Sequence, residues 1–273
     1  MRTTTLGNHQ VPVIGQGTWY MGEDPGKRRS EVAALQQGID LGLTLIDTAE
    51  MYAEGGAEEV VGEALTGRRE QVYLVSKVYP HNASRKGTIA ACERSLQRLA
   101  TEHIDLYLLH WRGQYPLEET VEAFERLREA GKIGRWGVSN FDTEDMRELD
   151  NPACATNQVL YNPQQRGIEF DLLPWCREHQ VPVMAYCPLA QAGRLLNHPV
   201  LAKIAEQHGV TPAQVSLAWV TRNDGVIAIP KAVEQRHVQL NAGAGKLVLK
   251  AEDLLAIDQA FPAPTRKQRL AMV

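Results

Sequence analysis

Four side chains of types that move or stabilise protons stand at or just after the ends of short apolar runs: Asp47, Tyr52, Lys77 and His110. A free tyrosine has a pKa near about 10 and is a weak acid at neutral pH. A lysine ammonium beside it favours the tyrosinate and lowers that pKa, and an aspartate would hold the ammonium in place. A histidine can donate or accept a hydrogen bond at a substrate oxygen. The set predicts an acid that protonates an oxygen on which negative charge develops, and reduction of a carbonyl by hydride has that need.

Each of these residues also has an ordinary structural interpretation. Tyr52 would be a loop tyrosine packed on the following helix, Lys77 and Asp47 would be an ion pair, and His110 would be a core histidine bonded to backbone. The order, the spacing and the strand-end positions of all four together favour the chemical interpretation. Neighbouring strands of a sheet lie about 4.8 Å apart, so side chains at adjacent strand ends can meet.

Eight short apolar runs predict the strands that would position these side chains. Their apolarity is continuous rather than alternating, which is typical of parallel strands covered on both faces. The runs are 13–18, 44–48, 72–77, 104–110, 135–140, 155–161, 181–188 and 226–231.

Helical patterns lie between the runs. Ser30 is placed to cap one helix, and the stretches 57–65, 86–99 and 118–130 show helical spacing of apolar residues. Thr211 precedes a proline and stands three residues before a glutamine, which is the pattern of a capping box. Alternating strands and helices predict an α/β fold, most simply a (β/α)8 TIM barrel, with an open doubly wound sheet as the alternative.

One barrel domain spanning 1–273 fits the length, although two smaller domains would fit it too. Before the first barrel strand, residues 3–6 and 11–13 flank Gly7-Asn8 and predict an N-terminal β-hairpin that would plug the bottom of the barrel. In such a barrel the chemistry lies at the carboxyl ends of the strands, where the loops converge.

Composition argues against several classes of protein. The net charge is −4 with no long basic run, so binding to nucleic acid is not expected. No apolar stretch is long enough for a membrane span, and the first residues lack the apolar core of a signal peptide. The four cysteines are scattered without paired spacing, which favours neither a zinc site nor disulfides and fits a reducing cytoplasm.

Seven segments resemble the motifs of the aldo-keto reductase superfamily, in the family's order and over most of the span from Gly15 to Asn241. They are LIDTAEMY at 45–52, VSKV at 75–78, LYLLHW at 106–111, GVSNF at 137–141, TNQVLYNP at 156–163, AYCPLAQ at 185–191 and IPKA at 229–232. Within the superfamily the chain looks most similar to bacterial methylglyoxal reductases, with 2,5-diketogluconate reductases close to them. The resemblance implies an enzyme that reduces small aldehydes and ketones with a nicotinamide cofactor.

The resemblance also implies a role for each matched residue. Tyr52 would donate the proton, Lys77 and Asp47 would adjust the pKa of Tyr52, and His110 would orient the carbonyl oxygen. The implied cofactor residues are Gly17, Thr18, Trp19, Asp47, Ser139, Asn140, Gln158, Tyr186, Leu189, Gln191, Lys231, Arg236, His237 and Asn241. The implied substrate residues are Trp19, Tyr20, Met51, Tyr79, His110, Trp111 and Tyr161.

The chain departs from the family pattern at three places. Cys187 replaces a serine that usually precedes Pro-Leu, and Ala232 replaces a serine common after the lysine. The family's arginine for the 2′-phosphate of NADPH usually stands four residues before the asparagine, where this chain has His237, with Arg236 one residue earlier. Lys231 remains, and Arg236 is close enough in the sequence to take the place of that arginine, so NADPH is the expected cofactor, with NADH as the open alternative.

The short tail after Phe261 predicts an open pocket with broad substrate tolerance. A monomer is expected by analogy alone.

Two other classes of protein are alternatives to a reductase. A non-catalytic redox sensor of the same fold would bind the cofactor without needing Tyr52, and a metal-dependent hydrolase is disfavoured because no His-x-His pair stands at a strand end.

Overall fold

The computed structural model describes residues 1–273 and contains ten strands and ten α-helices. The strands are β1 Thr3–Leu6, β2 His9–Pro12, β3 Gln16–Gly17, β4 Leu45–Asp47, β5 Tyr73–Val78, β6 Ile104–Leu109, β7 Ile133–Ser139, β8 Cys154–Leu160, β9 Val183–Tyr186 and β10 Val226–Ala228. The helices are α1 Arg28–Asp40, α2 Gly56–Ala64, α3 Arg85–Arg98, α4 Leu117–Glu129, α5 Thr143–Leu149, α6 Leu172–Glu178, α7 Pro199–His208, α8 Pro212–Val220, α9 Gln235–Ala244 and α10 Ala251–Ala260.

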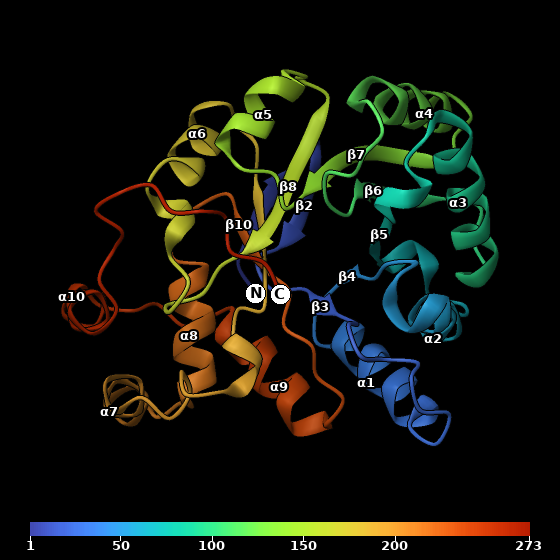
Figure 1. Cartoon of the computed structure of the whole chain (residues 1–273). Coiled ribbons are helices and arrows are strands. Elements are labelled where there is room, and N and C mark those ends of the chain that lie inside the picture. Colours follow the sequence, from blue (N-terminus) through green and yellow to red (C-terminus); the bar gives the residue numbers. More distant parts are fainter.

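Strands β3 to β10 form one parallel sheet in chain order, and this sheet closes on itself. Parallel bridges join Ile14 to Ala228 and Gly17 to Lys231, and the amide of Gly15 donates to the carbonyl of Ala228 at 2.8 Å. Figure 1 shows the helices as a ring around these strands. The predicted (β/α)8 barrel is confirmed, and each of the eight predicted runs overlaps one of its strands. The alternative open sheet is excluded because the first and last strands are bonded.

Alternation of side chains along each strand separates two cores. On β5, Tyr73 and Val75 belong to a cluster inside the barrel, whereas Leu74 and Val78 belong to the larger cluster between strands and helices. The antiparallel hairpin of β1 and β2 adds Leu6 and Val11 to the inner cluster, so it closes the amino-terminal end of the barrel. The predicted hairpin and its plugging position are therefore confirmed.

The helix predictions were accurate to about a residue, with one error in a cap. Helix α1 begins at Arg28 after Lys27, so Ser30 lies inside the first turn, where its hydroxyl donates to the carbonyl of Lys27 at 2.7 Å. The predicted Ser30 cap is wrong because the helix starts earlier than the apolar pattern does. The capping box of Thr211 is confirmed: its Oγ1 accepts from the amide of Gln214, whose side chain accepts from the amide of Thr211.

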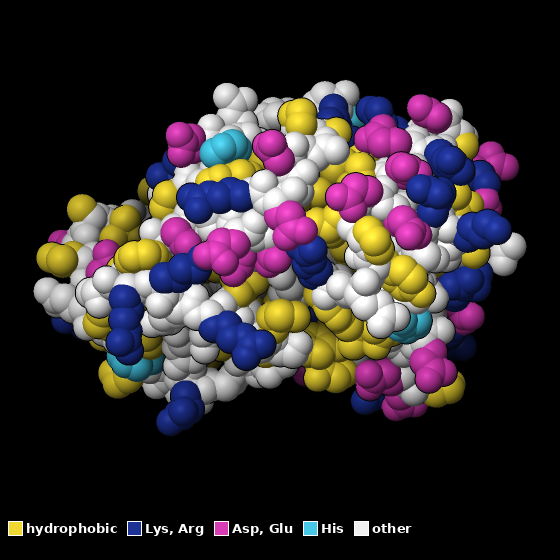
Figure 2. Space-filling model, turned by 45° about the horizontal axis from the view of Figure 1, so that its top comes forward, with side chains coloured by type: hydrophobic (Ala, Val, Ile, Leu, Met, Phe, Trp, Pro, Cys, Tyr) yellow, Lys and Arg dark blue, Asp and Glu magenta, His cyan; other side chains and the backbone are white.

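The surface mixes charges of both signs over most of the face in Figure 2. No helix of the structure is long and apolar enough to cross a membrane. No group of three or more histidine, cysteine, aspartate or glutamate side chains lies close enough together to hold a metal ion.

Candidate active site

Lys77 brings three elements together at the carboxyl end of the barrel. Its ammonium donates to Asp47 Oδ2 at 2.8 Å, to the carbonyl of Thr48 at 2.8 Å and to Tyr52 Oη at 3.1 Å. Lys77 is completely buried on β5 and Asp47, the last residue of β4, is 2% exposed. The phenol of Tyr52 is therefore fixed beside a cation that is itself held by a carboxylate.

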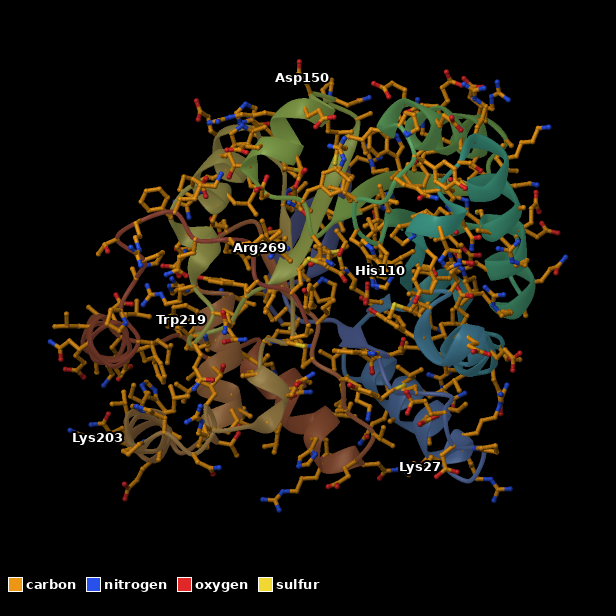
Figure 3. All side chains as sticks on the ribbon, viewed as in Figure 1. Lys27, His110, Asp150, Lys203, Trp219 and Arg269 are labelled. Atoms are coloured by element: carbon orange, nitrogen blue, oxygen red, sulfur yellow. The ribbon has the colours of Figure 1, made fainter.

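His110 follows β6 and completes the group. Its ring lies edge-on to the ring of Tyr52, with centroids 5.7 Å apart at 78°. The side chain is 8% exposed, and its Nδ1 is buried with no hydrogen-bond partner. Figure 3 labels His110 near the middle of the barrel. The structure thus brings together all four residues that the sequence singled out for chemistry.

A tight turn after β4 positions Tyr52. The 3-10 helix Tyr52–Gly55 contains two non-glycine residues in left-handed conformation, Ala53 and Glu54 with φ of 50° and 53°, and ends at Gly55 with φ of 94°. Left-handed backbone is unfavourable for residues with a side chain and persists where the surroundings hold it. This turn directs the tyrosine back toward Lys77 before α2 begins.

The electrostatics correct one sequence expectation. Burial, and then the charge of Asp47, raise the pKa of Tyr52 well above its usual range, whereas Lys77 was expected to lower it. Burial lowers the pKa of Lys77, whereas the negative charge of Asp47 acts to raise it. Burial and the charge of Lys77 lower the pKa of His110 well below its usual range. At neutral pH the site therefore presents a protonated phenol and a neutral imidazole.

A cavity of about 720 Å³ opens onto these groups at the strand ends. That volume is typical of small-molecule sites. Its wall contains most of the residues that the sequence assigned to catalysis, cofactor or substrate: Gly17, Thr18, Trp19, Tyr20, Asp47, Met51, Tyr52, His110, Trp111, Ser139, Asn140, Gln158, Tyr186, Leu189, Gln191 and Lys231.

Tyr161 is not in the cavity wall, which corrects its assignment to substrate. It is fully buried, its ring lies 5.3 Å from that of Trp219, and its hydroxyl donates to Glu169 at 2.6 Å. Figure 3 shows Trp219 well apart from His110. Tyr161 shares with Val159 the outer cluster beneath the helices, because alternation along the chain turns both side chains away from the barrel axis.

Tyr79 and three residues of α9 also lie outside the wall. Tyr79 packs edge-on against Trp111, with ring centroids 5.3 Å apart. Arg236 and His237 are exposed on α9, and Asn241 is 6% exposed on the same helix. Of the two cationic residues assigned to the cofactor phosphates, Lys231 lies in the cavity wall and Arg236 does not.

The C-terminal tail contributes to the cavity wall, which the sequence did not predict. The tail after α10 runs back to the middle of the barrel in Figure 1, and Met272 and Val273 form part of the cavity wall. Lys267 fastens it by ion pairs of 3.3 Å to Glu144 and to Asp171. Sequence reasoning gave no signal for this contact. It also gave no role to five other wall residues: Cys187, Pro188, Ile229 and Pro230, which lie inside recognised motifs, and Ala192, which directly follows one.

Polar side chains at one side of the cavity suit a carboxamide. Ser139, Asn140 and Gln158 offer both donors and acceptors, and the ring of Tyr186 lies beside them, bonded through its hydroxyl to Asn140 Oδ1 at 2.8 Å. Gln158 Nε2 also donates to Asp47 Oδ1 at 2.7 Å, which links this side of the cavity to the lysine. A flat amide-bearing ring could therefore lie against Tyr186 with its reactive edge toward Tyr52.

The closed α/β barrel and the cavity at its carboxyl end place the chain in a class of barrel oxidoreductases. A model of the aldo/keto reductase family matches residues 13–261. The chain belongs to the aldo/keto reductase family.

Individual relatives agree with the resemblance found in the sequence. The chain is 59% identical over 275 residues to methylglyoxal reductase YeaE of Escherichia coli, covering 98% of this chain and 97% of that one. A crystal structure of an aldo-keto reductase from Klebsiella pneumoniae in complex with NADPH is 57% identical, with a TM-score of 0.97 and complete coverage of both chains. A putative 2,5-diketo-D-gluconic acid reductase B is 31% identical, with a TM-score of 0.87 over 100% of this chain and 95% of that one.

Proposed function

We propose that this chain is an NADPH-dependent carbonyl reductase that converts small aldehydes and ketones, methylglyoxal and other 2-oxoaldehydes among them, to alcohols. The observation that carries the proposal is the buried ammonium of Lys77, bonded at once to Asp47 and to the phenol of Tyr52 at the wall of a cavity. The names of the similar proteins, a methylglyoxal reductase and a reductase solved with NADPH, support it.

The cofactor, when bound, supplies the hydride for the carbonyl carbon. Ser139, Asn140 and Gln158 would hold its carboxamide and Tyr186 would cover one face of its ring, as their places in the cavity wall allow. Leu189, Gln191 and Lys231 would lie along its phosphates. Arg236 would reach the 2′-phosphate from α9, with His237 and Asn241 on the same helix.

Side chains of the protein would bind the substrate oxygen and supply its proton. The substrate oxygen would accept hydrogen bonds from Tyr52 Oη and from the neutral imidazole of His110, and Tyr52 would transfer its proton as charge develops on that oxygen. The raised pKa of Tyr52 keeps the proton on the phenol until then. The ammonium of Lys77 would stabilise the tyrosinate left behind, because it already donates to that oxygen.

The mouth of the cavity supports a small, partly apolar substrate. Trp19 and Tyr20 stack with ring centroids 4.6 Å apart, and Met51, Trp111 and Met272 also line the wall. Such walls favour the apolar body of a small carbonyl compound.

The direct test follows the oxidation of NADPH with methylglyoxal and a panel of aldehydes. We expect turnover by the wild type, and a loss of about 10²–10⁴-fold in kcat for Tyr52→Phe with NADPH binding unchanged. Full activity of Tyr52→Phe would remove this residue from the mechanism. NADPH binding without turnover of any substrate would favour a non-catalytic sensor. We also propose that the enzyme acts as a monomer, which light scattering of the purified protein would check.

A further inference from the structure

Behind Lys77, on the helix side of β5, lies a buried polar cluster that takes no part in the cavity wall. Glu58 on α2 is completely buried and accepts from Ser76 Oγ at 2.5 Å and from Arg98 Nε at 2.7 Å. Arg98 is the last residue of α3 and is 21% exposed. The cluster therefore connects one strand and two helices through a single carboxylate.

The cluster acts on the strand that carries Lys77. Val75 faces the barrel interior and Leu74 and Val78 face the helices, so Ser76 points outward while Lys77, next to it, points inward. The hydroxyl of Ser76 is completely buried with the carboxylate. Strand β5 is thus bonded on its outer face by Glu58, one residue from the ammonium that contacts Tyr52.

The same cluster supports the turn that carries Tyr52. A Cβ on Gly55 would lie 2.4 Å from Arg98 Nε, so the arginine packs directly against this turn. The turn contains consecutive residues of positive φ, which surrounding contacts must hold in place. Arg98 thereby meets the end of the Tyr52 turn while its guanidinium is fixed by Glu58.

Stability alone is a weak explanation for the cluster. Burying an ion pair removes two charges from water, and well-packed apolar residues of similar volume are often as stable. Burial raises the pKa of Glu58, and the positive charge of Arg98 is the main influence that opposes this rise and favours the carboxylate. A costly buried carboxylate that joins the two catalytic elements from behind points to a role in their geometry.

We propose that Glu58, Arg98 and Ser76 form a brace of positioning residues that holds the phenol of Tyr52 against the ammonium of Lys77. The inference rests on the proposed function, because it concerns the 3.1 Å contact through which Lys77 acts on Tyr52. The brace touches neither substrate nor cofactor. Its loss should therefore alter the proton step and leave binding almost unchanged.

A matched control is an ion pair that bonds to the same strand. Arg69 is also 21% exposed and pairs with Asp105 at 2.7 Å, and Asp105 accepts from the amide of Leu74 near the opposite end of β5. We expect Arg98→Met to lower kcat by up to about 10²-fold, the effect of displacing a reacting group by an ångström. KM for methylglyoxal and NADPH affinity, measured by fluorescence, should stay near wild type. Arg69→Met should be destabilised in urea but keep its kcat.

Three further measurements separate positioning from general damage. Arg98→Lys should recover part of kcat, and Arg98→Met should shift the pH profile of kcat whereas Arg69→Met should not. In a Tyr52→Phe background, Arg98→Met should cause no further loss, because the group that it positions is gone. If Arg98→Met does not fold, Ser76→Ala removes only one hydroxyl and should lower kcat by about three- to tenfold with the same signature.

The outcomes distinguish the two proposals. Equal kcat values for the Arg98→Met and Arg69→Met proteins, or full additivity with Tyr52→Phe, would overturn the brace while the wild-type turnover stands. If Arg98→Met does not fold and only Ser76→Ala can be measured, an unchanged kcat and pH profile of Ser76→Ala would overturn the brace in the same way. A wild type that oxidises NADPH with none of the carbonyl panel would overturn the proposed function and the brace with it.

Discussion

Replacing Lys77 by methionine separates the structural role of this residue from its chemical one. Methionine retains much of the side-chain volume but removes all three donors of a completely buried ammonium. Asp47 would then keep one side-chain partner, the amide of Gln158 at 2.7 Å. Removing one member of a buried ion pair costs about 3–5 kcal/mol, so we expect the free energy of unfolding of Lys77→Met to fall by that amount in urea titrations.

A second substitution then separates the effect on the free energy of unfolding from the effect on turnover. In Lys77→Met/Asp47→Asn the unpaired carboxylate is gone, so most of the lost free energy of unfolding should return. Turnover should stay about 10²–10⁴-fold below wild type, because no cation remains beside Tyr52. The exposed pair Lys27–Asp24, 3.7 Å apart, provides the control, since Lys27→Met should change neither quantity. Wild-type kcat in the double variant would refute the assignment of Lys77 to the proton step.

Three other expectations are independent of that series. Because the pKa of His110 is held well below its usual range, the unfolded chain binds the extra proton first, and the free energy of unfolding should fall as the pH drops below about 6.5. His110→Asn should remove about 1.4 kcal/mol per pH unit of that fall in urea titrations at several pH values, and an unchanged slope would contradict it. Arg236→Ala should lower the ratio of kcat/KM with NADPH to that with NADH, and an unaltered ratio would leave Lys231 as the phosphate anchor. Deleting residues 270–273 removes one wall of the cavity, so KM for methylglyoxal should rise severalfold at constant kcat; an unaffected KM would show that the tail does not contact the substrate.

Strand periodicity predicted the strand-end residues of the site, whereas the other residues of the cavity wall were predicted only through the family resemblance. Asp47, Lys77, His110 and Gln158 each stand at or near the end of an apolar run, and a closed parallel barrel must bring such ends to one face. The residue types then limit the chemistry. Fold and site could therefore be predicted together, because the same pattern specifies both.

The errors arise where tertiary contacts decide. Tyr161 lies on the same motif as Gln158 but three positions further along the chain, and alternation therefore places its side chain with the helices. An extra residue on β8 opposite Trp136–Val138 further changes which side chains face inward. The tail reaches the cavity through Lys267 and its distant carboxylates, and nothing in the tail's own residues encodes that contact.

Glu58 shows why the support behind a site is harder to predict than the site itself. In the sequence it stands in the run Ala57-Glu58-Glu59 and is indistinguishable from the charge of a solvated helix face. Its burial depends on Arg98, forty residues away, and on a serine whose outward direction follows from its position on β5. Inward polar residues of a barrel are conspicuous because they interrupt an apolar pattern, whereas outward ones look like surface until their partners are known. The carboxylate of Glu58 therefore becomes recognisable only once the helices are placed, at the outward position next to the inward Lys77.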